Sequence, residues 1–335
     1  MPISNDLLSS TLYSIRDSEV DNLYKKVAFL DGVRRAGGVE TESGGIKIQR
    51  PLSIAEHSTI TQLATGYEPV SLAVNDVLRP AIYDWCDFTA PIVITKKEEM
   101  ENSGEYAIVK ILESRMKSVM GMLRRELNKQ ILRGDSAVLS AVNTLNGDVG
   151  LGSATGFLEH LSPALPSAQS NVVGGISKAT FQVPGWLNQF ANAGGALAMT
   201  DLYDLYIAAN NVAPSGDVSH LIMSNNAFAQ YRNLLFAQER FVQTDKLDGG
   251  RMALAFNGAV AEADPEMGFA SSVAGNCDAY MLNYDGIKLI FHSEGDFAVS
   301  PFEHISGTTA RAAQLYVKVQ LVADHLGGQG VLINA

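Results

Sequence analysis

Apolar residues recur every three or four positions along one long stretch of this chain, from about residue 98 to residue 133. The residues that set this period are Ile108, Leu112, Met116, Val119, Leu123, Leu127 and Ile131. Thr95 and Glu98 have the form of a capping box at its start, and Gly134 is a natural stop. If continuous, this helix would be about 54 Å long at 1.5 Å per residue, which is unusual inside a globular protein of this size.

Two consecutive regions before this helix have the character of β-strands. Residues 46–80 contain alternating apolar and polar positions with a turn signal at Gly66, which favours a long, exposed hairpin. An ordinary surface hairpin of a globular enzyme would show the same pattern. Residues 81–95 gather aromatic and β-branched side chains around Pro91 and predict a strand that enters a core.

A mixed α/β pattern follows the helix. Residues 143–199 are rich in glycine, serine, alanine, asparagine and proline, so we expect loops and short strands there. Next come a helix that Thr200 or Asp201 caps and that ends at Asn211, a strand at 220–223, and a helix at 225–236 capped by Ser224. This part predicts a second domain.

The last part of the chain predicts strands at 280–282, 287–292 and 314–322. The third of these alternates Leu315, Val317, Val319 and Leu321 with polar residues, so one of its faces should be buried. We expect these strands to return to the domain that contains the long helix. At the other end of the chain, residues 3–30 and the glycine-rich run at 37–45 indicate an extended or partly helical arm.

Composition and charge narrow the class of protein. The 335 residues are enough for one or two compact units, and 46% hydrophobic against 18% charged residues suggests that partners cover much of the surface. The net charge of −11 disfavours a dedicated nucleic-acid binder. However, residues 96–133 carry nine basic and six acidic side chains, whereas residues 137–335 carry eight and seventeen, so a basic segment lies against an acidic background.

Cysteine usage and hydropathy indicate where the protein works. Cys86 and Cys277 match no metal or redox spacing, which fits a reducing cytoplasm. Residues 1–16 lack the features of a signal peptide, and no stretch reaches the roughly 18 consecutive apolar residues of a membrane span. We therefore expect neither secretion by a signal peptide nor insertion in a membrane.

No catalytic constellation stands out. The glycine run at 150–156 lacks the Lys-Ser/Thr pair of a phosphate loop, and the six histidines are scattered without metal-binding spacing. Glu262, Asp264 and Glu266 could hold Ca²⁺ or Mg²⁺, but Pro265 and the absence of an EF-hand pattern favour a solvated acidic loop. The sequence therefore predicts no enzyme, no cofactor and no metal site.

The long helix also carries a basic set that consists of Lys110, Arg115, Lys117, Arg124, Arg125 and Lys129. These side chains could face nucleic acid without reading its sequence, or could pair with acidic neighbours in an assembly. Both interpretations remain open at the level of sequence.

The order of these elements resembles that of the major capsid proteins of tailed bacteriophages with the Hong Kong 97-type fold. Those proteins have an N-arm, an extended E-loop, a peripheral domain with a spine helix, and an axial domain. Local strings that strengthen the resemblance are His220 to Asn226, Tyr231 to Leu235, Phe256 to Gly258 and Asp264 to Met267, and the strands at 278–280, 287–289 and 311–322. The resemblance covers nearly the whole chain.

The resemblance implies an α+β fold with an N-arm at 1–45, an E-loop at 46–80, a peripheral domain at 81–145 and 275–335, and an axial domain at 146–274. It implies pentamers and hexamers of an icosahedral shell around phage dsDNA, assembled in the bacterial cytoplasm and found in the virion. Partners would be other copies, a separate scaffolding protein, a portal and weakly contacted DNA, with room for a decoration protein. The assembly interface would include Thr59, Ile60, Thr61, Tyr67 and Leu123.

Two alternatives remain. One is an α/β enzyme or ligand-binding protein with a site near Ser224 or Gly150. The other is a different phage structural component, such as a tail or decoration protein.

Overall fold

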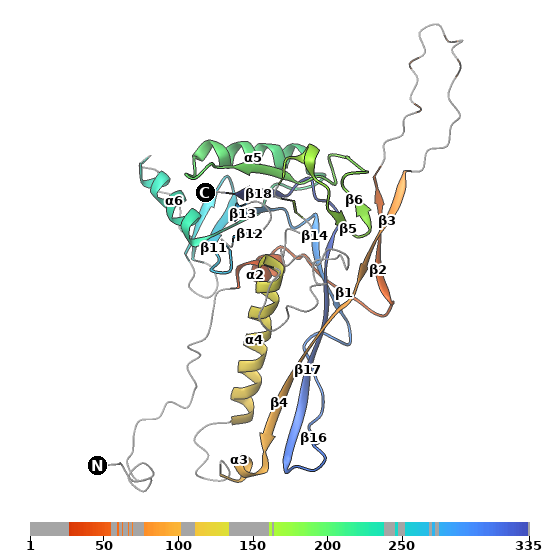
Figure 1. Ribbon diagram of the computed structural model, residues 1–335, viewed down its shortest axis with the longest axis vertical. Helices are drawn as coiled ribbons and strands as arrows, with labels where there is room; N and C mark the ends of the chain where they lie inside the picture. Colours follow the sequence, from red (N-terminus) through yellow and green to blue (C-terminus); the bar gives the residue numbers. More distant parts are fainter. Residues whose placement is uncertain are drawn as a thin grey trace.

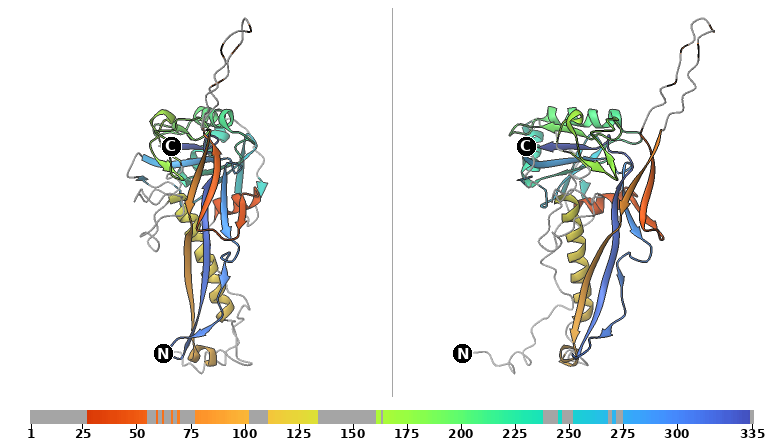
Figure 2. Two further views of the ribbon diagram at one scale, coloured as in Figure 1. Left: turned by 90° about the vertical axis from the view of Figure 1, so that its right-hand side faces the viewer. Right: turned by 45° about the vertical axis from the view of Figure 1, so that its right-hand side comes forward.

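The computed structural model describes residues 27–54, 59, 62, 66, 69, 77–101, 111–133, 161–162, 164–237, 245–246, 252–267, 270–271 and 275–333. A broad upper part contains one sheet with two helices, and a narrow lower part contains two long strands and one long helix (Figure 1). Figure 2 shows the same elongated outline from two further sides. The predicted α+β class is confirmed.

The upper part is built on an eight-stranded sheet in the order β7-β18-β13-β8-β11-β10-β9, with β12 paired to β13. Its strands are β7 (Gln189–Asn192), β8 (His220–Met223), β9 (Asp245–Lys246), β10 (Met252–Phe256), β11 (Ala259–Ala263), β12 (Ala270–Ser271), β13 (Gly275–Leu282) and β18 (Gly330–Ile333). The helices α5 (Met199–Val212) and α6 (Asn225–Ala237) pack on it. All four residues of β8 are buried. Strands that are buried on both faces appear in the sequence as short continuous apolar runs, which explains the pattern of this region.

The caps of these two helices differ in how well the sequence predicted them. Ser224 caps α6 as expected, because its Oγ accepts a hydrogen bond from the Ala227 backbone N–H at 3.1 Å. The cap of α5 was misplaced: neither Thr200 nor Asp201 is the N-cap, which is Ala198. Asp201 instead lies in the first turn and accepts the Ala198 N–H at 3.1 Å.

The lower part depends on a 14-residue strand, β17 (Ala310–Ala323). Its first ten residues pair with β4 (Cys86–Thr95), and its last five pair on the other edge with β14 (Ile287–His292). Further strands of this six-stranded sheet are β1 (Val39–Glu42), β15 (Ala298–Val299) and β16 (Glu303–His304). The predicted buried face is confirmed, since Leu315, Val317, Val319 and Leu321 are all 1% exposed or less.

The predicted single helix over 98–133 is wrong at its start. Lys96–Glu101 forms a short separate helix, α3, and the spine helix α4 begins at Ile111 and ends at Arg133. The sequence contains Asn102, Ser103 and Gly104 after α3, all poor helix formers in an interior position. The predicted capping box is confirmed, because Thr95 Oγ1 accepts the Glu98 N–H at 3.3 Å and Glu98 Oε2 accepts the Thr95 N–H at 3.0 Å.

Two hairpins lie along one side of the molecule, beside the upper part (Figure 1). The hairpin predicted for 46–80 is confirmed at its base, where β2 (Lys47–Ser53) pairs with β3 (Leu78–Asp84), and the second strand extends beyond residue 80. A small hairpin of β5 (Val172–Val173) and β6 (Ile176–Ser177) follows η3 (Pro166–Ala168). These short strands fit the prediction for residues 143–199 as far as that region is described.

Two assignments at the ends of the chain need correction. The glycine-rich run at 37–45 is not all loop, because β1 lies within it and pairs in parallel with β14. Residues 275–335 do not return to one unit: β13 and β18 join the eight-stranded sheet, while β14 and β17 join the other sheet. The physical reason is that β13 is buried between β8 and β18, so it belongs to the upper core.

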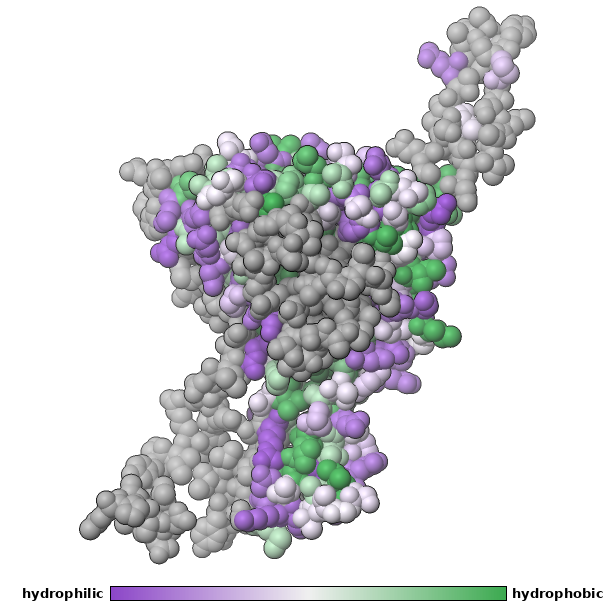
Figure 3. Space-filling model, viewed as in Figure 1, coloured by the Kyte–Doolittle hydropathy of each residue, from purple (hydrophilic) through white to green (hydrophobic). Residues whose placement is uncertain are grey.

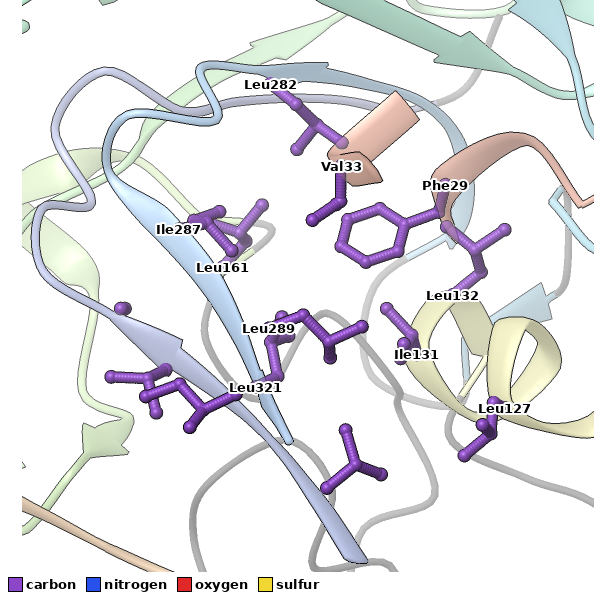
Figure 4. Packing of buried hydrophobic residues seen from close by; sticks show 14 of the residues in the cluster. Phe29, Val33, Leu127, Ile131, Leu132, Leu161, Leu282, Ile287, Leu289 and Leu321 are labelled. Carbon is purple, nitrogen blue, oxygen red and sulfur yellow. The ribbon is translucent and has the colours of Figure 1, made fainter. Parts of the chain in front are cut away.

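One core joins the two parts. Helix α2 (Ala28–Arg35) packs between α4 and the sheet of β14 and β17. Figure 4 shows Phe29 and Val33 of α2 gathered in one cluster with Ile131 and Leu132 of α4 and with Ile287 and Leu289 of β14. The two parts are therefore not independent domains, and the spine helix is held at its C-terminal half.

Replacing Leu123 with Asp should unfold or strongly destabilise the subunit. Leu123 is 7% exposed in this core, so the substitution loses apolar burial and leaves a carboxylate without a partner, at a cost of about 4 kcal/mol. Urea unfolding of the soluble subunit measures the change. Leu123→Met is the control and should cost less than about 1.5 kcal/mol; equal stability of the Asp variant and the wild type would refute the prediction.

Candidate assembly site

The β2–β3 hairpin leaves the body with one covered face and one open face. Ile48 and Tyr83 are directly opposite each other and are buried, and the Tyr83 hydroxyl donates to the Ala323 carbonyl at 3.0 Å. On the other face Leu78 is 66% and Ile82 is 43% exposed. The base of the hairpin is thus fixed to the end of β17 and presents apolar side chains outward.

Arg50 on β2 fixes the direction of this hairpin through three carboxylates from two other strands. Its guanidinium pairs with Glu40 and, at 3.5 Å, with Glu42 of β1, and its Nε lies 3.9 Å from Asp324 at the end of β17. Burial raises the pKa of the Asp324 carboxyl, and Arg50 opposes that rise. The arrangement holds a two-stranded ribbon that would be marginal by itself.

The small β5–β6 hairpin supports the same base from the side. The Ile82 N–H donates to the Gly174 carbonyl at 2.9 Å. Gly174 has a φ of +57°, and a Cβ there would lie 2.9 Å from Ala81 Cβ, so only glycine allows this approach. The guanidinium of Arg79 also lies 4.5 Å from the centre of the Phe181 ring, a cation–π contact.

The predicted interface residues have different outcomes. Thr59 is half-buried, whereas Ile60, Thr61 and Tyr67 lie outside the described residues. Leu123 is not available for an interface, because it packs inside the subunit's own core. Its place on the apolar stripe of the helix was predicted correctly, but the stripe faces inward.

Among the predicted basic residues, Arg115 pairs with an acidic neighbour. It forms a 2.6 Å ion pair with Glu98 and donates to the Val93 carbonyl at 2.6 Å, which ties α4 to α3 and β4. The hydrogen bond from Arg115 lowers the pKa of Glu98 to about 2. Lys110 lies outside the described residues.

The remaining basic side chains stay near the surface of α4. Lys117 and Arg124 are exposed, and Arg125 and Lys129 are half-buried. The Arg124 guanidinium lies 5.5 Å from the centre of the Phe297 ring. These four basic side chains of α4 are therefore exposed or partly exposed in the single subunit.

A buried carboxylate, Asp264, connects elements that are far apart in sequence. Its Oδ2 accepts the Ala28 N–H of α2 at 3.1 Å and the Asn128 side-chain amide of α4 at 3.0 Å. Its Oδ1 accepts the Glu266 N–H at 2.9 Å. Burial is the main cause that raises the pKa of Asp264, and these three hydrogen bonds oppose it.

Glu262, two residues earlier, lies in a second buried polar contact. Its Oε1 is 2.7 Å from His220 Nε2, and the His220 Nδ1 is 2.9 Å from the Tyr284 hydroxyl. Arg35 at the end of α2 reaches the same carboxylate at 3.6 Å. A Cβ on Gly32 would lie 2.3 Å from the Tyr284 oxygen, so glycine is required for α2 to come this close.

The prediction of a solvated acidic loop at Glu262, Asp264 and Glu266 is therefore wrong for the first two, which are at most 1% exposed. Within the part of the chain that is described, no cluster of three or more His, Cys, Asp or Glu side chains is arranged to hold a metal ion. The apolar neighbours of Glu262, namely Val260, Ala261 and Ala263, were the available signal for its burial. They place Glu262 within a strand.

The sites named for an alternative enzyme show no catalytic arrangement where they are described. Ser224 bonds to the Asp278 carboxylate at 3.2 Å and caps α6. Gly150 lies outside the described residues. Among the residues that the structure describes, no helix is long and apolar enough to cross a membrane.

Comparison with known proteins gives a consistent result at the level of fold. No protein-family model and no curated protein match the sequence. The capsid asymmetric unit of cyanophage A-1(L) matches with a TM-score of 0.67 and 18% identity over 99% of both chains. The capsid of Myoviridae phage XM1 matches with a TM-score of 0.59 and 9% identity, over 100% of this chain and 99% of that one.

An encapsulin is also similar. The holo-SrpI encapsulin complex from Synechococcus elongatus PCC 7942 matches with a TM-score of 0.56 and 10% identity, over 96% of this chain and 94% of that one. The fold is thus one that phage capsids and encapsulins share. It is the Hong Kong 97-type fold, as the resemblance in the sequence implied.

The stability of the subunit should fall between pH 6.5 and pH 4 because of His325. Burial lowers its pKa to about 4, so below pH 6.5 the unfolded chain binds a proton that the folded chain refuses. The contribution of neutral His325 to the free energy of unfolding is fully present above pH 6.5 and is lost as the pH falls through 4. The loss is at most about 3 kcal/mol. Urea unfolding across this range should show a smaller loss for His325→Gln than for the wild type; equal slopes would contradict the assignment.

Proposed function

We propose that this chain is the major capsid protein of a tailed phage, a structural subunit and not an enzyme. Copies associate into pentamers and hexamers of an icosahedral shell that encloses dsDNA. The observation that carries the proposal is the full-length match to phage capsids, which covers 99% or more of both chains in two cases. Because the match extends over the whole chain, a capsid-type fold accounts for the whole chain.

The exposed surface supports association. Large apolar side chains are exposed on the hairpin, on α4, on α5 and on the lower sheet, including Leu78, Met122, Ile207 and Tyr316. Figure 3 shows apolar surface on the narrow part of the molecule as well as on the broad part. A shell would cover these side chains, each interface contributing roughly 25 cal/mol per Å² of apolar surface before the costs of association.

The same proposal assigns partners and place. A separate scaffolding protein and a portal would guide assembly in the bacterial cytoplasm, where the buried thiol of Cys86 stays reduced. Support for dsDNA as the content comes from the phage capsids among the similar structures. An encapsulin role is the second candidate, because one encapsulin complex matches over 96% of this chain.

Electron microscopy and size-exclusion chromatography of the purified chain, with and without the phage's scaffolding protein, test the proposal. Closed particles or capsomers are expected. A monomer whose melting temperature responds to small ligands would overturn it, and closed particles that form around a protein cargo would favour the encapsulin role.

Deleting Thr59–Gly66 should leave a folded subunit that assembles poorly. These residues lie beyond the paired strands, which end at Ser53 and Leu78, so folding does not depend on them. The hairpin loses reach and side chains, so particle yield in electron micrographs should fall while thermal unfolding is unchanged. Replacing the same residues with an equally long Gly-Ser segment is the control that separates reach from side-chain contacts. Normal particle yield from the deletion would exclude an inter-subunit role.

Mature particles should contain no covalent link between subunits through this hairpin. Between Arg50 and Thr95 the sequence has no lysine, and Lys47 at the base is held 2.9 Å from Asp84. An amine that attacks an amide must be delivered to its target, and the part of the hairpin beyond Arg50 has none to deliver. Particles boiled in detergent and reductant should give one band near 35.9 kDa. A ladder of larger bands that Lys47→Arg abolishes would identify Lys47 as the donor instead.

A further inference from the structure

Two prolines lie directly opposite each other in the β2–β3 hairpin. The register of the hairpin pairs Pro51 with Pro80, and both residues are exposed. Proline has no backbone N–H to donate to a neighbouring strand, so it is confined to positions where a strand needs no donor. The two residues therefore report which way their backbone groups point.

The missing N–H groups belong to the outer edges of the hairpin. In an antiparallel pair, residues that exchange hydrogen bonds alternate with residues whose N–H and C=O groups point away from the partner strand. Ile82 is two positions from Pro80, and its N–H points outward to the Gly174 carbonyl at 2.9 Å. In the alternate positions, the Ile54 N–H donates across the hairpin to the Val77 carbonyl at 3.0 Å. The prolines thus remove no hydrogen bond between β2 and β3, and each removes one outward donor.

The two prolines interrupt both edges at the same level. The outward-pointing positions are Lys47, Gln49, Pro51 and Ser53 on β2, and Leu78, Pro80, Ile82 and Asp84 on β3. Among the described strands, no third strand pairs with either edge. A strand that added to an edge would need a donor at every second residue, and the proline ring also obstructs its approach.

The composition of the hairpin makes such protection necessary. On its open face Leu78 is 66% and Ile82 is 43% exposed. An exposed apolar strand with a free edge is a template for pairing with another chain. Because every copy carries the same hairpin, the nearest available partner for a free edge is the hairpin of a second copy.

We propose that Pro51 and Pro80 determine how copies of this chain associate, by blocking strand addition at both edges of the hairpin. A second copy then contacts the hairpin through side chains and not through a continuous sheet. Both edges must be blocked for different reasons: one free edge would close into a dimer, whereas two free edges would join copies into an open-ended polymer. This inference goes beyond the proposed shell, since it holds for any association of the chain.

Valine substitutions test the role of the prolines. Pro51→Val with Pro80→Val restores one outward N–H on each edge and should leave the hairpin folded, because valine favours strands. Each restored hydrogen bond should raise the association constant through the hairpin by about twofold to tenfold. In sedimentation velocity at a concentration where the wild type does not assemble, the double variant should form polymers, and either single variant should stop at dimers. A double variant that sediments like the wild type would overturn the proposal.

Gln49→Val with Ser53→Val is the matched control. These positions share the open face and already have outward N–H groups, so the control adds β-branched apolar side chains without adding a donor. It should associate no more than the wild type. Association equal to that of the double proline variant would show that apolar surface, and not the edges, drives the pairing.

Amide hydrogen exchange locates the contact in the double proline variant. The new N–H groups at residues 51 and 80 should exchange rapidly in the dilute monomer, because they point to solvent, and should become protected in the polymer. Circular dichroism and thermal unfolding confirm that the variant is folded. Slow exchange of these two groups in the monomer, or no protection in the polymer, would show that the prolines do not guard the edges. The wild-type shell is not needed for any of these measurements, so their outcome is independent of the proposed function.

Discussion

The buried carboxylate of Asp264 is the interaction on which the arrangement of this subunit depends. It joins the start of α2, the side of α4 and its own turn after β11, which come from three distant parts of the chain. Placing a charge inside a protein costs several kcal/mol unless hydrogen bonds offset that cost. Here three donors offset part of it, and burial still raises the pKa of Asp264. Because Glu262 nearby binds His220 and reaches Arg35, both ends of α2 are held by carboxylates two positions apart.

This junction also connects the base of the β2–β3 hairpin to the core of the subunit. The core that α2 closes continues through β14 to β17, and the end of β17 carries Asp324 and the Ala323 carbonyl. Those two groups contact Arg50 and Tyr83 at the base of the hairpin. A contact made by the hairpin is thereby connected, through the end of β17, to the same core that orients the spine helix.

Elements that are defined by neighbours along the chain could be predicted from the sequence. Elements and contacts that depend on residues far apart in the sequence could not. The bounds of β8 and β14 were predicted to the residue, because each is a continuous apolar run next to a turn. Strand β1 was missed because its partner, β14, lies about 250 positions away, and the glycines around it suggested a loop. At the site, the hairpin was predicted from its alternation, but Arg50 was not, because its partners come from β1 and β17. Asp264 was noticed and misread, since only the fold brings Ala28 and Asn128 to it.

The continuity of β17 limits how the subunit can change shape. Ten successive residues of this strand pair with β4, and the pairing with β14 begins on the other edge at Val319, where the pairing with β4 ends. There is no loop at this crossover to absorb large changes of φ and ψ, so a hinge between the upper and lower parts is excluded along this strand. A paired ribbon bends easily only by changing its right-handed twist. In the shell that we propose, any adjustment to the different curvatures around five and six copies would therefore be torsional and spread over many residues. It would rotate α4 together with the strands on which it packs.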